Sequence, residues 1–558
     1  MNPDQSNVAE RGKKRSTDAV VVGAGFAGLY MLHRLRKLKM SVAAFEAGSG
    51  VGGTWYWNCY PGARCDIESM QYSYSFSPEL EQEWKWTEVF ASQQEILAYI
   101  NHVADRFDLR RDIQFDTKVT GAEYDAAARR WVVRTNRGDL ISCRFLITAV
   151  GCLSEAQIPE LPGMASFKGE TYHTGRWPRR PVDFTGKRVA VIGTGSSGIQ
   201  VVPVIAEKAK HLTVLQRTAN FSIPARNRPM TEEYERHWKS GYAELRNKAR
   251  LGRSATLYDA NNVSALAVTE EERRREFEAR WKKGGANFLA AYNDLIFSVE
   301  ANKTAAEFVK ERILETVKDP EVAEKLVPKD LPIGAKRICL DSNYFETFNR
   351  PNVTLVDITA EPITEVTANE IRTGSRLHEV DCIVFATGYD AVTGALLGMN
   401  IRGLEGLPLK IKWAEGPQAY LGLMTAGYPN LFMITGPGSP SVLANVVMAI
   451  EQHVDFIADC ISYMAANGFD TIDADPDAEE AWLKHVEDAS KLTVYSLAKT
   501  WYNGGNIQGK PRRFLPYIGG FAPYRQKCED CIAKGYEGFR MTPGDIRAGL
   551  PAAQAASS

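Results

Sequence analysis

The chain has 558 residues, which is too long for a single hydrophobic core and predicts two or three domains. Hydrophobic residues make up 44% and charged residues 24%, as in ordinary globular proteins. The formal net charge of −1 gives no reason to expect nucleic acid or an anionic membrane as a partner.

The N-terminal residues, the apolar runs and the cysteines indicate the cellular location of the protein. Residues 1–17 are polar, and no later run is apolar enough to cross a bilayer, so we expect neither a signal peptide nor a membrane span. The nine cysteines are odd in number and scattered, which favours a reducing, cytoplasmic location. Cys528 and Cys531 form a C-x-x-C without a second pair, so we expect no metal site there.

The first motif is a glycine-rich turn between a strand and a helix. Residues 19–22 (AVVV) are predicted to be a buried parallel strand, 29–38 a helix and 41–48 a second strand. The turn between them, G-A-G-F-A-G, provides Gly23, Gly25, Ala27 and Gly28. Such glycines permit a tight turn, the approach of backbone N–H groups to a pyrophosphate, and close helix–strand packing. The sequence therefore predicts a dinucleotide site.

The same pattern recurs at residues 187–218. A strand (187–193) leads into a second G-x-G-x-x-G turn, a helix (199–210) and another strand (212–218). The predicted contacts of this second site are Thr194, Gly195, Ser196, Ser197, Gly198 and Gln200. The chain is thus predicted to be an α/β protein with two Rossmann-like dinucleotide-binding domains.

The residues at the ends of the second strands indicate which nucleotide each site holds. Glu46 lies 18 residues after Gly28, the last glycine of the first motif, where a carboxylate can accept hydrogen bonds from ribose hydroxyls. Arg217 and Thr218 stand at the matching place after the second motif, and an arginine there can pair with a 2′-phosphate. We therefore predict FAD at the first site and NADPH at the second; the alternative is that Arg217 is an ordinary surface arginine.

Other segments complete the expected architecture. Two apolar runs that end in glycine, 145–151 and 382–388, are predicted to be buried strands that return to the sheets. The stretch from about 225 to 332 is charged and helical, with a capping box at Thr269–Glu272 and a stop at Gly284–Gly285. We expect this stretch to be a helical insertion in the second nucleotide domain.

A longer motif lies between the two sites. Residues 167–178 read F-x-G-x-x-x-H-x-x-x-W-P, and the chain thereby resembles the type I Baeyer–Villiger monooxygenases. The segments YPGARCDIES (60–69), VIGTGSSGIQ (191–200), GAKR (334–337), FATGYDA (385–391) and GPGSPSVLAN (436–445) bring it nearest to the subgroup of phenylacetone and steroid monooxygenases. The resemblance runs from about residue 18 to residue 540. It implies a discontinuous FAD domain (1–152 and 390–558) and an NADPH domain (153–389) that contains the insertion 225–332.

The resemblance also implies a reaction. NADPH reduces FAD, O₂ adds to give a C4a-peroxyflavin, and this attacks a ketone to yield an ester or lactone. Arg337 occupies the position of the family's catalytic arginine, Asp66 that of the carboxylate that orients it, and Lys336 that of a 2′-phosphate contact. From the residues alone, Arg337 and Asp66 can equally be a structural ion pair.

Further roles are carried over by the same resemblance. The flavin contacts are Gly53, Thr54, Trp55, Asp66, Tyr72, Val119 and Val446, and Trp501 matches a mobile-loop tryptophan that covers NADP⁺. The alternative for Trp501 is a core aromatic, against which Gly504-Gly505-Asn506 indicates a loop. His173 and Trp177 are expected to organise the hinge between domains rather than to catalyse. Cys59 and Val446 depart from residues common in close relatives.

Competing functions are a flavin monooxygenase that oxygenates sulfur or nitrogen, a disulfide reductase and a non-catalytic NADPH/FAD sensor. The Trp177-Pro178 end of the motif argues against the first, the lack of a cysteine pair after the first nucleotide motif against the second, and Arg337, Asp66 and Lys336 against the third. Aryl, cyclic and steroid ketones are all compatible with the sequence. We expect a monomer or a small homo-oligomer.

Overall fold

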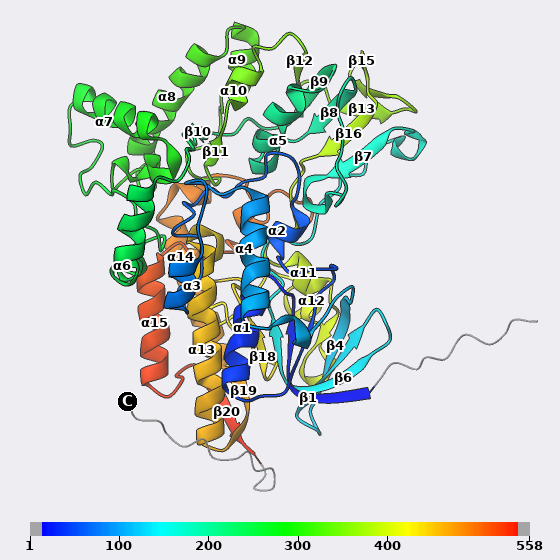
Figure 1. Ribbon diagram of the computed structural model, residues 1–558, viewed down its shortest axis with the longest axis vertical. Helices are drawn as coiled ribbons and strands as arrows, with labels where there is room; N and C mark the ends of the chain where they lie inside the picture. The colour runs from blue at the N-terminus through cyan, green and yellow to red at the C-terminus, as the bar shows by residue number, and fades with distance from the viewer. Residues whose placement is uncertain (1–13, 545–558) are drawn as a thin grey trace, which may run out of the picture.

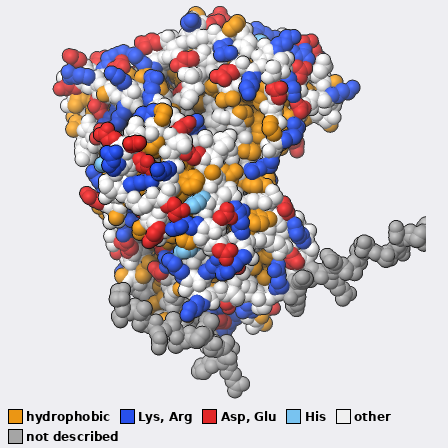
Figure 2. Space-filling model, viewed as in Figure 1, with side chains coloured by type: hydrophobic (Ala, Val, Ile, Leu, Met, Phe, Trp, Pro, Cys, Tyr) orange, Lys and Arg blue, Asp and Glu red, His pale blue; other side chains and the backbone are white. Residues whose placement is uncertain are grey.

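The computed structural model describes residues 14–544, and in it two β-sheets lie one above the other with helices packed around them (Figure 1). On the face shown in Figure 2, positive and negative side chains are interspersed, in keeping with the net charge of −1. Within the described residues, no helix has both the length and the apolar character needed to cross a membrane.

The lower sheet has eight strands, which run in the order β17-β4-β5-β6-β1-β2-β3, with β18 paired to β6. Strands β1, β2, β3, β6 and β18 are parallel, whereas β5 pairs antiparallel with both β4 and β6. Their bounds are β1 (Lys14–Val22), β2 (Val42–Phe45), β3 (Ile113–Gln114), β4 (Val119–Asp125), β5 (Arg130–Thr135), β6 (Leu140–Thr148), β17 (Ile401–Arg402) and β18 (Leu431–Met433).

The side chains of β1 point alternately to the two faces of this sheet, and both faces are buried. Ala19 and Val21 belong to the same apolar cluster as the helices α1 and α13, while Val20 and Val22 face a second cluster with Trp131. Because side chains alternate across a strand, an unbroken apolar run requires cover on both sides. The helices of this unit are α1 (Phe26–Lys37), α2 (Thr54–Trp57), α3 (Pro78–Glu83), α4 (Gln93–Arg106), α11 (Gly394–Leu397), α12 (Leu409–Lys412), α13 (Val446–Ala466), α14 (Pro476–Lys491) and α15 (Phe521–Ala533). Beside them the strands β19 (Phe469–Ala474) and β20 (Phe539–Pro543) form an antiparallel pair.

The upper sheet is wholly parallel, in the order β12-β9-β8-β16-β7. Its strands are β7 (Glu170–His173), β8 (Arg188–Ile192), β9 (His211–Gln216), β12 (Val353–Asp357) and β16 (Cys382–Phe385), with helices α5 (Ser196–Ala206) and α10 (Tyr344–Thr347). A small antiparallel meander, β13 (Ile363–Val366), β14 (Glu370–Thr373) and β15 (Arg376–Glu379), packs against it. The predicted strand–glycine turn–helix–strand units are therefore confirmed in both sheets.

The predicted helical insertion is present, but its helices do not all pack on the upper unit. It contains α6 (Glu232–Arg250), α7 (Glu270–Lys283), α8 (Val299–Thr316) and α9 (Pro320–Leu326), and it is flanked by the paired strands β10 (Ser222–Pro224) and β11 (Cys339–Asp341). The capping box of Thr269 and Glu272 and the stop at Gly284 are as predicted. Helices α7 and α8 join the apolar core of the upper unit, whereas α6 reaches down beside α3 and α15 (Figure 1) and buries Trp238 and Tyr242 in the lower core.

A buried arginine fastens α6 to the lower unit. The guanidinium of Arg246, 1% exposed, donates to the carbonyl of Gln71 at 2.8 Å, to Ser73 Oγ at 2.7 Å and to Glu81 Oε1 at 3.2 Å. Burial raises the pKa of Glu81, against the lowering effect of Arg246. The insertion therefore bridges the two units.

We expect Arg246→Met to destabilise the protein by about 3 kcal/mol, since it leaves the Glu81 carboxylate buried without its cationic partner and removes donors from the Gln71 carbonyl and Ser73 Oγ. Thermal unfolding followed by circular dichroism measures the effect. Lys248→Met, at an exposed position of the same helix, serves as the control and should change stability by less than about 0.5 kcal/mol. Equal melting temperatures for the two variants would contradict the bridging role.

Candidate active site

A single cavity of about 1310 Å³ collects almost all of the predicted site residues. It exceeds the roughly 300–1,000 Å³ that is usual for one small ligand, so it has room for more than one. The exceptions are Gly28 and Gly198, which lie behind the cavity wall. The predicted residues that line it are Gly23, Gly25, Ala27, Glu46, Gly53, Thr54, Trp55, Asp66, Tyr72, Val119, Thr194, Gly195, Ser196, Ser197, Gln200, Arg217, Thr218, Lys336, Arg337, Val446 and Trp501.

The two glycine turns have the same construction. Gly23 and Gly193 have φ of +107° and +108°, and a Cβ on either would lie within 2.5 Å of a carbonyl oxygen of the neighbouring strand's end. A Cβ on Gly28 or Gly198 would lie 1.9 or 2.3 Å from the carbonyl oxygen of that same turn glycine. Thus the last glycine of each motif permits helix–strand contact, and the earlier ones leave the helix N-terminus open to the cavity.

Glu46 is fixed beside the first turn. It follows β2 directly, is 5% exposed, and accepts hydrogen bonds from the backbone N–H groups of Ala24 (2.9 Å) and Gly48 (2.8 Å). Burial raises the pKa of this carboxyl, and those two N–H groups oppose the rise. Its side chain also borders the cavity, in the place where a nucleotide ribose is bound in folds of this type.

Positive charge gathers near the second turn. Arg217 and Thr218 follow β9 and are exposed, and Lys336 lines the same part of the cavity. Burial lowers the pKa of Lys336, and the neighbouring Arg217 charge adds to this lowering. Two cations held close together without a counter-charge are a suitable site for a phosphate, which would relieve their repulsion. The Thr194 hydroxyl donates to the Thr218 carbonyl at 3.0 Å and ties this strand end to the turn.

The Arg337–Asp66 pair joins residues 271 positions apart in the sequence. Arg337 Nε and Nη2 donate to the two Asp66 oxygens at 2.6 and 2.8 Å, and Nη1 donates to the Val442 carbonyl at 2.6 Å. Burial acts to raise the pKa of Asp66, but the charge and hydrogen bonds of Arg337 outweigh it and hold the pKa below its ordinary value. The pair is therefore ionised, and its side chains, 32% and 27% exposed, face the cavity.

The other predicted flavin contacts form the lower wall. Trp55 Nε1 donates to the Tyr72 hydroxyl at 3.2 Å, and Val119 begins β4. Val446 is the first residue of α13 and lines the cavity, so its departure from the family pattern falls at the site. Cys59 does not line the cavity; its thiol faces the Trp177 and Pro178 carbonyls.

The long motif lies at the edge of the upper sheet rather than at the reacting centre. His173 ends β7, is 4% exposed, and accepts a hydrogen bond from the Gly175 N–H at Nδ1 while Nε2 pairs with the Thr387 hydroxyl at 3.3 Å. Burial lowers its pKa, so it is neutral. Trp177 is buried against Tyr172 and Phe184. This geometry agrees with a structural role for both residues.

Trp501 begins a short 3₁₀ turn, Trp501–Asn503, and its ring lies 4.1 Å from that of Tyr502. It lines the cavity and is half-buried, so it is neither a fully buried core residue nor a free surface one.

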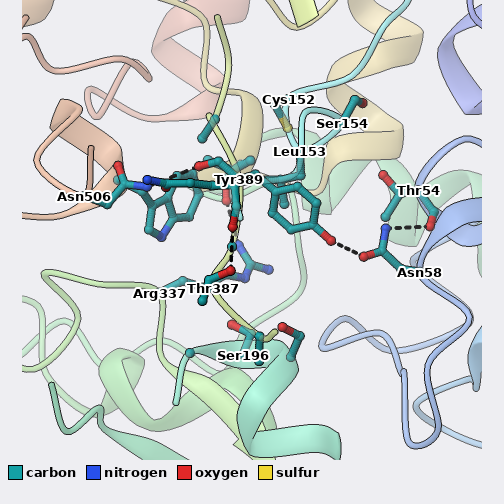
Figure 3. Close-up of a pocket in the computed structure, with 18 of the residues that line it drawn as sticks. Thr54, Asn58, Cys152, Leu153, Ser154, Ser196, Arg337, Thr387, Tyr389 and Asn506 are labelled. Carbon is teal, nitrogen blue, oxygen red and sulfur yellow. Dashed lines mark hydrogen bonds between the residues drawn. The ribbon is translucent and has the colours of Figure 1, made fainter. Parts of the chain in front are cut away.

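Sequence reasoning missed four polar residues that line the cavity (Figure 3): Asn58, Thr387, Tyr389 and Asn506. Tyr389 and Thr387 lie within the quoted FATGYDA segment and Asn506 follows the glycines of the 501–506 loop. Only the structure shows that they meet.

The cavity thus has two open glycine turns, each with a polar residue suited to a nucleotide ribose or its phosphate. The residues present fit two dinucleotides, one held by the lower unit and one by the upper. An enclosed ion pair between them gives the arrangement of an oxidoreductase that brings a flavin and a nicotinamide coenzyme together.

Comparisons with known proteins identify the family. Residues 20–282 match the model of the pyridine nucleotide-disulphide oxidoreductases. A Baeyer–Villiger monooxygenase from Pseudooceanicola batsensis is 42% identical over 93% of this chain and 95% of its own. A phenazine N-monooxygenase from Lysobacter antibioticus is 42% identical over 94% of this chain and 97% of its own.

Solved structures agree. Oxidised steroid monooxygenase bound to NADP has a TM-score of 0.91 and 52% identity, and OTEMO in complex with FAD and NADP has a TM-score of 0.92 and 41% identity. Each match covers 95% of this chain and 100% of the other. The chain belongs to the Baeyer–Villiger monooxygenases and uses FAD and NADPH. The predicted family, fold class and cofactors are confirmed.

Replacing Arg217 with alanine should raise the KM for NADPH by about tenfold or more, because a charge-assisted hydrogen bond to the 2′-phosphate is lost. Steady-state oxidation of NADPH and NADH by the same variant measures this. NADH lacks that phosphate and is therefore an internal control. Equal effects on both coenzymes would contradict the assignment of the second site.

Proposed function

We propose that this monooxygenase inserts oxygen beside the carbonyl of aryl, cyclic or steroid ketones, with Arg337 as the residue that touches the reacting atoms. The supporting observation is that Arg337 uses three of its five N–H groups on Asp66 and Val442. The remaining donors are free to face a ligand. A fixed cation of this kind stabilises developing negative charge on oxygen in a site that excludes water.

The two cofactors are assigned to the two glycine turns. In this proposal FAD lies along Gly23, Gly25, Ala27, Gly28, Glu46 and the 53–55 segment, with Asp66, Tyr72, Val119 and Val446 around it. NADPH lies along residues 194–198 and Gln200, with Arg217, Thr218 and Lys336 at its 2′-phosphate. When bound, reduced FAD supplies the activation of O₂, and the side chains of this chain bind, orient and exclude water.

The substrate class rests on the relatives and on the cavity wall. The relatives include enzymes named for a steroid and for cyclohexanone, at 52% and 41% identity. Leu153, Val442, Ala444 and Leu497 give part of the cavity wall an apolar lining, which suits a ketone of low polarity, and the Val442 carbonyl contacts Arg337.

The remaining predictions belong to the same proposal. The division into residues 1–152 with 390–558 and 153–389 follows the strands, since the lower sheet uses residues 14–148 and 401–433 and the upper sheet 170–385. The ends of the chain lie outside the described residues. All nine cysteines are free thiols, which supports a reducing, cytoplasmic location. A monomer or small homo-oligomer stays a prediction.

A second candidate is oxygenation of a ring nitrogen, which the phenazine N-monooxygenase relative favours. That relative is as similar in sequence as the Baeyer–Villiger one, at 42% identity each. The protein scaffold therefore does not by itself decide between carbon and nitrogen as the acceptor.

A panel of phenylacetone, cyclohexanone, progesterone and phenazine, incubated with FAD-loaded enzyme, NADPH and ¹⁸O₂, tests the proposal. We expect labelled ester or lactone from at least one ketone and no labelled phenazine N-oxide, measured by mass spectrometry. Labelled N-oxide without any ester would establish the second candidate. NADPH consumption with no labelled product would contradict both.

In the same assay, Arg337→Lys should lower ester formation by at least about a hundredfold, since a single ammonium cannot hold both Asp66 oxygens and face the ligand at once. Arg274→Lys is the matched control, because Arg274 forms an exposed pair with Glu311 on the insertion helices. Ester formation by Arg337→Lys at the rate of that control would reduce Arg337 and Asp66 to a structural pair.

For Trp501→Ala we expect NADPH to be oxidised with less ketone product and more hydrogen peroxide, because an indole that covers the coenzyme helps to keep water out. The ratio of product to NADPH consumed, with peroxide measured in parallel, reports this coupling. An unchanged ratio would leave Trp501 as a packing residue.

A further inference from the structure

The two connections between the sheets are hydrogen-bonded to each other. The chain passes from β6 to β7 through residues 149–169 and leaves β16 through residues 386–392. The backbone N–H of Gln157 donates to the Gly388 carbonyl at 2.9 Å. In the other direction, the backbone N–H groups of Asp390 and Val392 donate to the carbonyls of Glu155 (2.9 Å) and Cys152 (2.8 Å). We call these two segments, 152–157 and 388–392, the paired connection. Both crossings of the chain between the two sheets therefore run through it.

Tyr389 is the residue through which the paired connection contacts residues 53–58. We call these residues the flavin segment, because Gly53, Thr54 and Trp55 are predicted flavin contacts. Its hydroxyl donates to Asn58 Oδ1, and the Asn58 side-chain amide donates in turn to the Thr54 carbonyl at 2.9 Å (Figure 3). Asn58 caps the C-terminal end of α2 and is 8% exposed. The tyrosine ring lies so close to Gly175 of the long motif that a Cβ there would be 2.5 Å from it. One side chain thus spans the gap between the upper unit and α2.

The loop that carries Trp501 is fastened to the same connection. The Asn506 side-chain amide donates to the Tyr389 carbonyl at 3.2 Å. Lys510 forms an ion pair with Asp390 and donates to the Ala391 carbonyl at 3.2 Å. The position of loop 499–510 over the cavity therefore depends on where residues 389–391 are held.

We propose that Tyr389 is a positioning residue: its hydrogen bond to Asn58 holds the paired connection against α2, and with it the Trp501 loop over the coenzyme. The inference rests on the proposed placement of FAD beside residues 53–55 and of NADPH under Trp501. Without the hydroxyl, the connection and the loop move as one body away from the flavin segment. Retention of the oxidised coenzyme then weakens, and the reaction becomes less coupled to product.

Tyr389→Phe removes the hydroxyl and keeps the ring against Gly175. In FAD-loaded protein we expect the Kd for NADP⁺, measured by calorimetry, to rise about five- to tenfold, the effect of one buried hydrogen bond. The fraction of NADPH that yields peroxide rises with it. Limited trypsin digestion without any coenzyme should cut several-fold faster after Lys499, since the loop opens more often.

Tyr428→Phe is the matched control. The Tyr428 side chain is fully buried in the lower unit, donates one hydrogen bond to the Leu407 carbonyl at 2.9 Å and lies outside the cavity. It reports the general cost of a lost tyrosine hydroxyl. Asn58→Ala combined with Tyr389→Phe should be no worse than Asn58→Ala alone, because both changes break the same contact.

The outcomes separate the possibilities. Tyr389→Phe with the NADP⁺ affinity, coupling and digestion rate of Tyr428→Phe would overturn the inference. Faster digestion with unchanged NADP⁺ affinity would also overturn it, since the loop would then be loosened without effect on the coenzyme. Wrong placement of the coenzymes shows itself separately, as equal effects of Arg217→Ala on the KM values for NADPH and for NADH.

Discussion

The ion pair of Arg337 and Asp66 is the interaction around which the cavity is organised. A guanidinium inside a protein requires a counter-charge and good hydrogen bonds, or the loss of hydration makes it too costly to hold. Asp66 provides both oxygens at 2.6 and 2.8 Å, and the Val442 carbonyl provides a third acceptor. These three residues come from three separate parts of the chain, so correct assembly of the fold and formation of the site are the same event.

The parallel sheets determine where everything else lies. Strands β1 and β2 end at the first glycine turn and Glu46, and β8 and β9 end at the second turn and Arg217. Ligands in such folds bind at the carboxyl ends of the strands, and both sets of ends open into one cavity. A flavin and a nicotinamide coenzyme must approach each other for electron transfer. The two sheets make this possible because each provides one strand–glycine turn–helix–strand unit at the same cavity.

Local pattern made the fold and much of the site predictable. The strand–glycine turn–helix segments depend on neighbours in sequence, so the turns, Glu46 and Arg217 could be identified from spacing, as could the capping box at Thr269. The course of α6 could not, because its docking depends on Arg246 meeting Gln71, Ser73 and Glu81, which are remote in sequence. The pairing of Arg337 with Asp66 was predicted only through the family resemblance, because the two residues are 271 positions apart. The contacts of Tyr389 with Asn58 and Asn506 were missed because these residues are also remote from it in sequence.

The paired connection also explains why the long motif is diagnostic without taking part in the chemistry. His173 binds Thr387, and Gly175 leaves space for the Tyr389 ring, so the motif packs against residues 387–389 rather than against a substrate. Its residues fix the edge of the upper sheet at the point where the chain crosses back to the lower one. Because the two sheets carry the two coenzyme sites, the geometry of this crossing sets how the two cofactors meet. A motif that governs the crossing is therefore required wherever this two-cofactor arrangement is used, whatever the substrate.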